Sequence, residues 1–402
     1  MKWEKVKLGD VSESCLGKML DQRKNKGTYK PYLANINVRW GSFDLENLQK
    51  MKFEEHENKR YGIKYGDLII CEGGEPGRCA IWKEEIPNMK IQKALHRVRL
   101  KDEMDYRYVY YWFLLAGKTG ALKQYYTGAT IMHMPGEKLK EVTIDKPPLV
   151  VQKRIRSHLE AFDNLIENNK KQIKLLEEAA QRLYKEWFVD LRFPGHEDVA
   201  IVDGIPERWK KVVIKDICLK MNAGGTPTRN KASFWDNATI KWYKTGELQD
   251  CWLIDSEEYI SMEGLNCSSA KLFPKNTVVI AIYASPTLGR LGILSDEAAC
   301  NQAALCLVAD EEKCSWQWLY QKLYELRDDF NMIARGAGQQ NISAEVVKMK
   351  EILLPEKILI EQYTKIVEKQ FSRRLVLQLQ NKILTEARDR LLPKLMNGEI
   401  EV

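Results

Sequence analysis

The sequence of 402 residues has little that points to a membrane or secreted protein. It contains no run of about 18 apolar residues, which a membrane-spanning helix would need. Its first residues, 1–4, lack the apolar segment of a signal peptide. The nine cysteines include no Cys-x-x-Cys pair, so neither a zinc ribbon nor a disulfide framework is indicated. We therefore expect a cytoplasmic protein, without membrane contact, whose cysteines are small buried apolar side chains.

A recognisable set of catalytic residues is also missing. Residues 117–119 read Gly-Lys-Thr, but a phosphate-binding loop would need glycine at position 112, which is Trp112. Residues 145–149 resemble the motif of amino-methyltransferases superficially, yet they carry an inserted lysine and lack the aromatic residue, which favours a proline-rich helix start. The five histidines have no zincin spacing, and no Ser/His/Asp group can be assembled. We expect no catalysis, cofactor or metal on this chain.

The composition is that of an ordinary globular protein, with 44% hydrophobic and 30% charged residues. Its length allows two or three domains with proper cores. The formal net charge of +7 suits a polyanion as partner, although 63 basic against 56 acidic residues is a mild excess. Charge alone therefore decides little about function.

The most informative feature is an internal repeat with a period of roughly 208 residues, far longer than the 20 to 50 residues of solenoid repeats. Residues 3–11 match 209–217, and a buried strand followed by a glycine turn and an arginine occurs at 66–78 and again at 275–290. Further matches pair 91–95 with 301–305, 128–129 with 336–337 and 139–142 with 349–352. The repeat indicates a duplicated domain, and duplicated domains often bind two similar things.

Each copy ends in a long predicted helix. After Pro147 and Pro148, apolar residues spaced four and three apart predict a helix from about 149 to 188, roughly 60 Å long. This heptad seam consists of Ile155, Leu159, Phe162, Ile166, Asn169, Ile173, Leu176, Ala180, Leu183 and Trp187. Asn169 is its one polar member, and it either fixes the register of a helix pair or is simply solvated.

The second helix has a weaker stripe, formed by Ile366, Gln370, Arg373, Leu377, Gln380, Leu384, Ala387 and Leu391. Such a helix needs a partner, and the economical arrangement packs the two long helices antiparallel, as a spacer with one globular domain at each end. A homodimer through the same seams is the alternative. Because 391–394 reads Leu-Leu-Pro-Lys, we expect the second helix to be the shorter one.

The predicted loops of both copies mix basic, amide and aromatic residues, which can neutralise phosphates and read base edges in DNA. In the first copy the candidates are Arg23, Lys24, Asn35, Asn37, Arg39, Arg78, Thr130 and His133. In the second they are Thr226, Arg229, Lys231, Lys241, Tyr243, Lys244, Arg290, Arg335, Gln339, Gln340 and Asn341. Arg78, Arg290, Gln339 and Gln340 are the first choices for DNA contacts. The alternative is that these loops are solvated and have merely diverged.

Three segments carry a family likeness: 180–196 after the central helix, 224–227 with the sequence Gly-Gly-Thr-Pro, and 289–290 with 301–303. On these, the chain resembles the specificity subunit of type I DNA restriction-modification systems over its whole length. The resemblance implies a mixed α/β fold with two target recognition domains separated by two antiparallel coiled-coil-like helices. It further implies a non-catalytic subunit that binds a bipartite, asymmetric DNA target, each domain reading one half.

The resemblance also implies the partners: double-stranded DNA, two methyltransferase subunits docked on the helices, and restriction (motor) subunits. S-adenosylmethionine, ATP and magnesium would belong to those subunits. The helix pair would act as a ruler that separates the half-sites in units of the roughly 34 Å DNA turn. A scaffold that bridges proteins without DNA remains the alternative, and an autonomous methyltransferase or nuclease is disfavoured. The expected segments are 1–148 (first recognition domain), 149–190 (central helix), 191–208 (linker), 209–356 (second recognition domain) and 357–402 (C-terminal helix).

Overall fold

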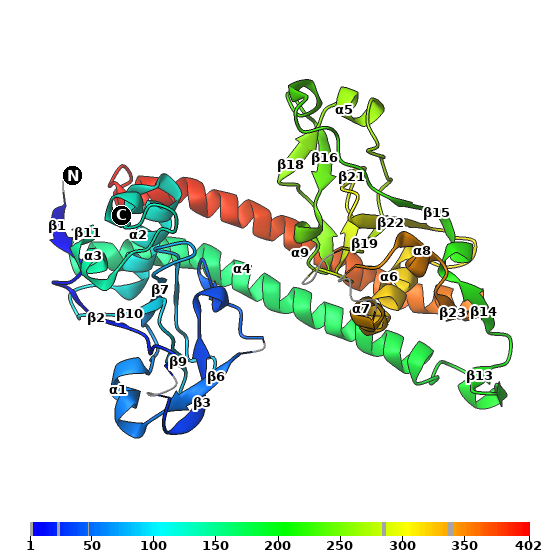
Figure 1. Cartoon of the computed structure of the whole chain (residues 1–402), viewed down its shortest axis with the longest axis horizontal. Coiled ribbons are helices and arrows are strands. Elements are labelled where there is room, and N and C mark those ends of the chain that lie inside the picture. The colour runs from blue at the N-terminus through cyan, green and yellow to red at the C-terminus, as the bar shows by residue number, and fades with distance from the viewer. Residues whose placement is uncertain (1–2, 22–24, 47, 284–286, 337–340) are drawn as a thin grey trace. The chain divides into compact units, whose positions relative to one another are not determined.

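The computed structural model describes residues 3–21, 25–46, 48–283, 287–336 and 341–402, with only the backbone of 335 and 336 (Figure 1). The chain forms two compact units: Met1–Leu165 with Leu384–Val402, and Ile166–Ile383. The long helices α4 (Leu149–Tyr184) and α9 (Lys357–Met396) each contribute to both units. The domain borders expected from the sequence stay a prediction, because compactness alone does not delimit a recognition domain.

The first unit builds its globular part from short strands and three helices that precede α4. In chain order these are β1 (Glu4–Lys7), β2 (Ser12–Leu16), β3 (Thr28–Leu33), β4 (Val38–Arg39), β5 (Ser42–Phe43), β6 (Lys50–Phe53), α1 (Asn58–Tyr61), β7 (Leu68–Cys71), β8 (Cys79–Ile81), β9 (Lys90–Ile91), β10 (Leu95–Leu100), α2 (Tyr106–Thr119), α3 (Gly136–Glu141) and β11 (Thr143–Lys146).

A four-stranded sheet of order β2-β10-β7-β8 forms the centre of this unit, beside a smaller sheet of order β6-β3-β9. Strand β7 is buried over its whole length because its two faces pack into different cores. Leu68 and Ile70 face a core that includes α2, whereas Ile69 and Cys71 face the core under the small sheet. Strands β1 and β11 pair antiparallel, which ties the start of the chain to the strand before α4.

The second unit contains a similar series of elements before α9. These are β12 (Ile201–Val202), β13 (Ile205–Pro206), β14 (Lys210–Val213), β15 (Cys218–Ala223), β16 (Ile240–Tyr243), β17 (Cys251–Leu253), β18 (Glu258–Ile260), α5 (Met262–Asn266), β19 (Val278–Ala281), β20 (Leu291–Leu294), β21 (Ala299–Cys300), β22 (Ala304–Ala309), α6 (Trp316–Glu325), α7 (Arg327–Gly336), α8 (Ala344–Lys348) and β23 (Glu351–Leu354).

The two units share one topology, as the sequence repeat predicts. The order β15-β22-β19-β20 repeats β2-β10-β7-β8, the order β18-β16-β21 repeats β6-β3-β9, and β14-β23 repeats β1-β11. Strand β17 is an addition, paired parallel to β20 at the edge of the second unit's main sheet. Together with the long helices, this confirms the predicted mixed α/β fold with two similar globular parts.

Helix α4 begins at Leu149, as the prolines before it predict, and a π-helical turn at Lys185–Val189 continues it. All residues of the predicted heptad seam are buried or half-buried. Asn169 is 7% exposed, and its Nδ2 donates to Oε1 of Gln380 on α9 at 3.5 Å. The interpretation of Asn169 as a solvated residue is therefore wrong, because the side chain lies between the helices and has a polar partner there.

Helix α9 spans 40 residues, against 36 in α4 and five more in the π-helical turn that continues α4, so the two helices are about equally long. The expectation that residues 391–394 end the second helix is wrong. Pro393 lies inside the helix, which continues because Leu395 and Met396 are buried in the core of the first unit. The stripe also differs in its first part, where Ile366 and Arg373 are exposed.

The buried face of α9 in the second unit is formed instead by Tyr363, Val367, Phe371, Arg374 and Leu377. Aromatic and basic side chains on this face obscure the apolar pattern in the sequence. This explains why the buried face of α9 differs from the predicted stripe. The two long helices run antiparallel within the second unit. Glu177 on α4 pairs with Arg374, and Asn169, earlier on α4, pairs with Gln380, later on α9.

The two motif look-alikes have ordinary structural roles. Residues 117–119 form the last turn of α2, which ends at Gly120 in the left-handed region with φ of 75°. Pro147 and Pro148 connect β11 to the start of α4. Both placements agree with the interpretation of these segments as structural. No helix among the described residues combines the length and apolar character that crossing a membrane requires.

Candidate nucleic-acid interface

In the first unit, the turn between β7 and β8 brings Asn35 and Arg78 together. Arg78 donates from Nη2 to the carbonyl oxygen of Asn35 at 3.0 Å and from Nη1 to Oε2 of Glu75 at 2.9 Å. The other oxygen of Glu75 accepts from Nε1 of Trp40 at 2.7 Å. The Arg78 side chain is only 18% exposed, so its guanidinium holds the loop that carries Asn35 rather than projecting into solvent.

His133 also lies against this turn, where it forms an isolated β-bridge with Gly73. A Cβ added to Gly73 would lie 3.1 Å from Nδ1 of His133, and one added to Gly74 would lie 3.1 Å from Nδ2 of Asn35. Two glycines thus let both side chains approach the backbone closely. Thr130 is exposed at the tip of the loop that His133 closes by pairing with Thr127. Three predicted residues, Asn35, Arg78 and His133, therefore share one surface region.

Asn37 and Arg39 follow Asn35 but differ in accessibility. Asn37 is 8% exposed, accepts from the backbone nitrogen of Ala34 at 2.9 Å and donates to the carbonyl of Asp44 at 3.1 Å. Its prediction as a DNA contact is not supported, because its polar atoms are used to shape the loop. Arg39 is exposed and pairs with the Asp44 carboxylate at 3.5 Å.

In the second unit, two segments that carry the family likeness, 224–227 and 301–303, pack together into one surface. Gly224 and Gly225 bond to the carbonyls of Ala304 and Cys300 at 3.0 and 2.9 Å, and side chains on either glycine would collide with backbone. The hydroxyl of Thr226 donates to Oε1 of Gln302. Residues 224–227 and 301–303, far apart in sequence, therefore contact each other directly.

Beyond this surface, Arg229 stacks on two tryptophans. Its guanidinium lies 3.9 Å from the ring centroid of Trp235 and 5.0 Å from that of Trp242. Nη1 donates to the carboxylate of Glu258 on β18. Lys244 joins the same group, since its Nζ lies 2.9 Å from carboxylate oxygens of both Glu257 and Glu258. These two hydrogen bonds raise the pKa of Lys244.

The remaining lysines of this region are also paired. Lys231 lies 2.7 Å from a carboxylate oxygen of Glu263, and Lys241 lies 2.6 Å from one of Asp296. Tyr243, by contrast, is 1% exposed in the core under the small sheet. Its prediction as a DNA contact is not supported, because strand β16 turns its side chain inward.

Arg290 occupies the turn that corresponds to that of Arg78. Gly289 has a φ of 78°, and its carbonyl accepts from Nε of Arg327 at 2.8 Å, which anchors the turn. Among the described residues, no hydrogen bond or ion pair involves the Arg290 guanidinium. Arg335 lies near the end of α7, and only its backbone is described. Asn341 is exposed. Arg23, Lys24, Gln339 and Gln340 lie outside the described residues.

Sequence reasoning missed the acidic and aromatic partners of these cations, above all Glu75, Trp235 and Glu258. Trp235 is close to Arg229 in sequence, and an arginine followed by a tryptophan is a usable signal for stacking. Glu258 comes 29 residues after Arg229, and only the pairing of β16 with β18 brings it near. No local pattern in the sequence could have found it.

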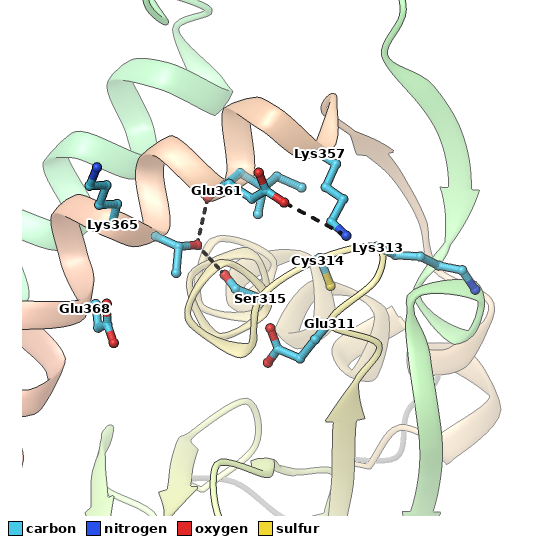
Figure 2. A pocket seen from close by; sticks show the side chains of 10 residues that line it. Glu311, Lys313, Cys314, Ser315, Lys357, Glu361, Lys365 and Glu368 are labelled. Atoms are coloured by element: carbon cyan, nitrogen blue, oxygen red, sulfur yellow. Dashed lines mark hydrogen bonds and ion pairs between the residues drawn. The ribbon is translucent and has the colours of Figure 1, made fainter.

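A cavity of about 340 Å³ lies beside α9 in the second unit (Figure 2). Its lining residues are Glu311, Lys313, Cys314, Ser315, Lys357, Ile360, Glu361, Thr364, Lys365 and Glu368. Lys357 lies 3.9 Å from Glu361, and the hydroxyls of Ser315 and Thr364 are 2.7 Å apart. Burial raises the pKa of the Cys314 thiol, which keeps it protonated and unreactive. Because glutamate and lysine side chains balance each other in this lining, it suits contact with another polar surface better than catalysis.

Among the residues that the structure describes, one group of side chains has atoms close enough to share a metal ion. Ligand atoms of Glu54, His56 and Glu57 lie within 4.8 Å of one another. However, Nζ of Lys18 donates to the Glu57 carboxylate at 2.5 Å, and this bond acts against burial to lower the pKa of Glu57. Because a lysine already compensates this charge, the group is better explained by a largely buried ion pair between Lys18 and Glu57.

Comparison with known protein families gives two matches, one in each copy of the duplication. The family model of the type I restriction modification DNA specificity domain matches residues 1–178 and 206–386. The type I restriction enzyme MjaIX specificity subunit of Methanocaldococcus jannaschii is 27% identical over 345 residues, covering 84% of this chain and 78% of that protein. The HindI specificity subunit of Haemophilus influenzae is 23% identical over 477 residues, covering 99% of each chain.

A solved structure shares the fold. The crystal structure of the S subunit of a type I restriction-modification system from M. genitalium superposes with a TM-score of 0.56 at 16% sequence identity. The superposition covers 98% of this chain and 96% of the other. The family model covers most of the chain, in two matches that correspond to the two copies. The chain therefore belongs to the type I restriction modification DNA specificity domain family.

Proposed function

We propose that this chain is the DNA sequence-recognition subunit of a type I restriction-modification complex and binds a bipartite, asymmetric target. The observation that carries the proposal is the duplicated scaffold, which presents polar loops at equivalent places in both copies. Asn35, Arg78 and His133 gather at the β7–β8 turn, and Arg290 occupies the matching turn of the second copy. Two copies of one scaffold with different loop side chains suit the recognition of two different half-words, the two specified base sequences of the bipartite target.

The partner subunits are part of the same proposal. We propose that two methyltransferase subunits dock on this chain, that restriction subunits join the complex, and that this chain itself is non-catalytic. S-adenosylmethionine, ATP and magnesium would then be bound by the partners, and the complex would act on cellular DNA in the cytoplasm. Val376, Leu379 and Ile383 are exposed apolar residues spaced three and four apart on one face of α9, and they support a protein contact on that helix in the second unit.

The test is to produce the chain together with its methyltransferase partner and to map methylated bases in the host genome. We expect one motif with two specified half-words and an unspecified gap. Binding of the purified complex to that duplex should weaken steeply as salt rises, because phosphate contacts release counterions. The same complex should bind a duplex with both half-words scrambled much more weakly.

A matched control uses the methyltransferase partner without this chain. Loss of the motif in that control assigns sequence recognition to this chain. Methylation by this chain alone would contradict the non-catalytic role. A complex that forms normally but binds all duplexes equally would contradict DNA recognition and leave the protein-bridging scaffold.

A further inference from the structure

Arg229 is held more rigidly than an exposed loop arginine usually is. Its guanidinium lies 3.9 Å from the centroid of Trp235, and that ring meets Trp242 edge-on, with centroids 5.3 Å apart and planes at 89°. Trp242 is 2% exposed and fixed by a hydrogen bond from Nε1 to the carbonyl of Gly225 at 2.9 Å. The arginine therefore rests on a platform that is itself part of the core of the small sheet. Figure 1 shows this sheet, with β16 and β18, beside α5 in the second unit.

The carboxylate of Glu258 restricts this guanidinium further, because it binds one of its nitrogens. It accepts from Nη1 of Arg229, and this bond, followed by that of Lys244, lowers the pKa of Glu258, which keeps it ionised. Among the described residues, Nη1 is the one nitrogen of Arg229 with a hydrogen-bond partner, and the side chain is 51% exposed. Nε and Nη2 are thus free to donate two parallel bonds on one edge of the guanidinium.

The local charge decides which DNA group this edge suits. Arg229 and Lys244 are balanced by Glu257 and Glu258, so the group carries no net positive charge that would attract a phosphate. Glu258 would in addition repel a phosphate placed beside Arg229. A neutral base edge meets neither obstacle. Two parallel donors match the O6 and N7 acceptors of guanine in the major groove, which is the commonest specific contact of arginine.

We propose that Arg229 reads a guanine in the half-word bound by the second copy, and that Trp235 and Glu258 are positioning residues for it. This inference rests on the proposed function. Preorganisation is the reason for the arrangement, since a side chain already fixed in space loses less conformational entropy when it binds.

The experiment uses the complex of the full chain with its methyltransferase partner and duplexes in which each base pair of the target is replaced in turn. For the wild-type chain, one G·C pair in the second half-word should contribute roughly 5-fold to 150-fold to affinity. Arg229→Ala should abolish discrimination at that pair alone. Arg229→Lys should reduce it strongly, because lysine lacks the planar pair of donors and the guanidinium face that stacks on Trp235. Glu258→Gln should reduce it at the same pair, and discrimination in the first half-word should stay unchanged.

Arg208→Ala is the matched control, because Arg208 is also an exposed arginine paired with a carboxylate, that of Glu356, and is not among the predicted DNA contacts. It should change no single base preference. A uniform loss of affinity on all duplexes for Arg229→Ala, with a smaller salt slope, would show a phosphate contact and overturn the proposal. Unchanged binding, or a second half-word without guanine, would overturn it too. If the wild-type complex has no bipartite target, the proposed function itself fails, which is a different result.

Discussion

At the residue scale, two arginines at equivalent positions of the duplication have different environments. Arg78 donates to Glu75 and to the Asn35 backbone, whereas no described residue forms a hydrogen bond or ion pair with the guanidinium of Arg290. The scaffold fixes the position of the arginine after the glycine turn, but its neighbours decide its role. We therefore propose Arg78 as a positioning residue, whereas Arg290 stays a candidate for direct contact.

We predict that Arg78→Ala weakens recognition of the first half-word by about 1–3 kcal/mol, the size of a lost base contact. Without the guanidinium, the Asn35 loop loses an anchor. Arg78→Lys should fail to restore binding, because one ammonium cannot replace the two bonds to Glu75 and Asn35. Fluorescence anisotropy with duplexes changed in each half-word measures this. Full rescue by lysine together with a changed salt slope would instead show a phosphate contact.

His96 predicts a pH dependence of stability. It is 1% exposed on β10, its Nε2 lies 3.0 Å from the Met134 carbonyl, and burial lowers its pKa below the ordinary 6.5. The unfolded chain therefore binds a proton more readily than the folded one, and stability should fall as pH drops below about 6.5 toward the folded-state pKa. Urea unfolding midpoints of wild type and His96→Gln measure this, and the variant should lose less stability on acidification.

The control for this prediction is His158→Gln, which changes an exposed histidine on α4. It should leave the pH dependence of the wild-type chain in place. Identical pH profiles for wild type and His96→Gln would show that other groups cause any acid sensitivity.

At the element scale, polar pairs specify how α4 and α9 meet. In the second unit, Arg374 of α9 pairs with Glu177 of α4, and in the first unit Arg388 of α9 pairs with Asp163 of α4. Both pairs place the arginine on α9 and the carboxylate on α4, and on each helix the two positions are two heptads apart in sequence. Pairing two copies of the same helix would oppose like charges, so this pattern favours α4 with α9 over self-association.

Arg374 should be the most sensitive of these positions. Its side chain is 1% exposed, and Nη2 also donates to the carbonyl of Asp250 at 2.9 Å. We predict that Arg374→Ala destabilises the chain by about 3–5 kcal/mol, because Glu177 is left half-buried without its cation. Urea unfolding of the free chain measures the loss.

The apolar double variant Glu177→Leu with Arg374→Met is the control. It removes both charges while retaining side-chain volume, so it should be more stable than Arg374→Ala. A loss below about 1 kcal/mol for the single variant would show that this pair contributes little to stability, as exposed pairs do.

At the scale of the whole molecule, the ruler hypothesis predicts a defined change in the DNA target. Seven residues inserted between Leu165 and Ile166, with seven more between Ile383 and Leu384, would lengthen both helices by about 10.5 Å. One heptad changes the facing of a helix by only about 20°, so the seam is retained. We expect the gap between the half-words to grow by about three base pairs, at 3.4 Å each, with both half-words unchanged. Methylome sequencing measures it.

A seven-residue insertion in the linker after α4, within residues 191–208, is the matched control. It adds the same length outside the helices and should leave the gap unchanged. An altered half-word with the original gap in the helix variant would contradict the ruler hypothesis.

Much of the fold could be predicted because its signals are local or repeated. The seam of α4 repeats every heptad, and the strand with its glycine turn occurs twice, at β7 and β19. The errors lie where a local signal was outweighed by packing. Pro393 suggests a helix end, but burial of Leu395 and Met396 carries α9 past it. Arg374 reads as polar in the sequence and is one of the most buried residues of α9.

The candidate site was less predictable for a different reason. Residue type showed which side chains can contact DNA, but Asn37 and Tyr243 have the right chemistry and face inward. The side chains that organise the site, Glu75 and Glu258, act through contacts with other segments of the chain.

The sequence by itself determined the duplication, the two long helices and the family, because each follows from residues repeated at fixed spacing. Only the tertiary structure decided which cations are free, which are paired with carboxylates, and which polar residue fixes the helix pair. Those properties depend on contacts between segments far apart in the chain, such as Arg229 with Glu258 and Asn169 with Gln380. Burial and charge pairing are set by these distant neighbours, and spacing along the sequence does not encode them.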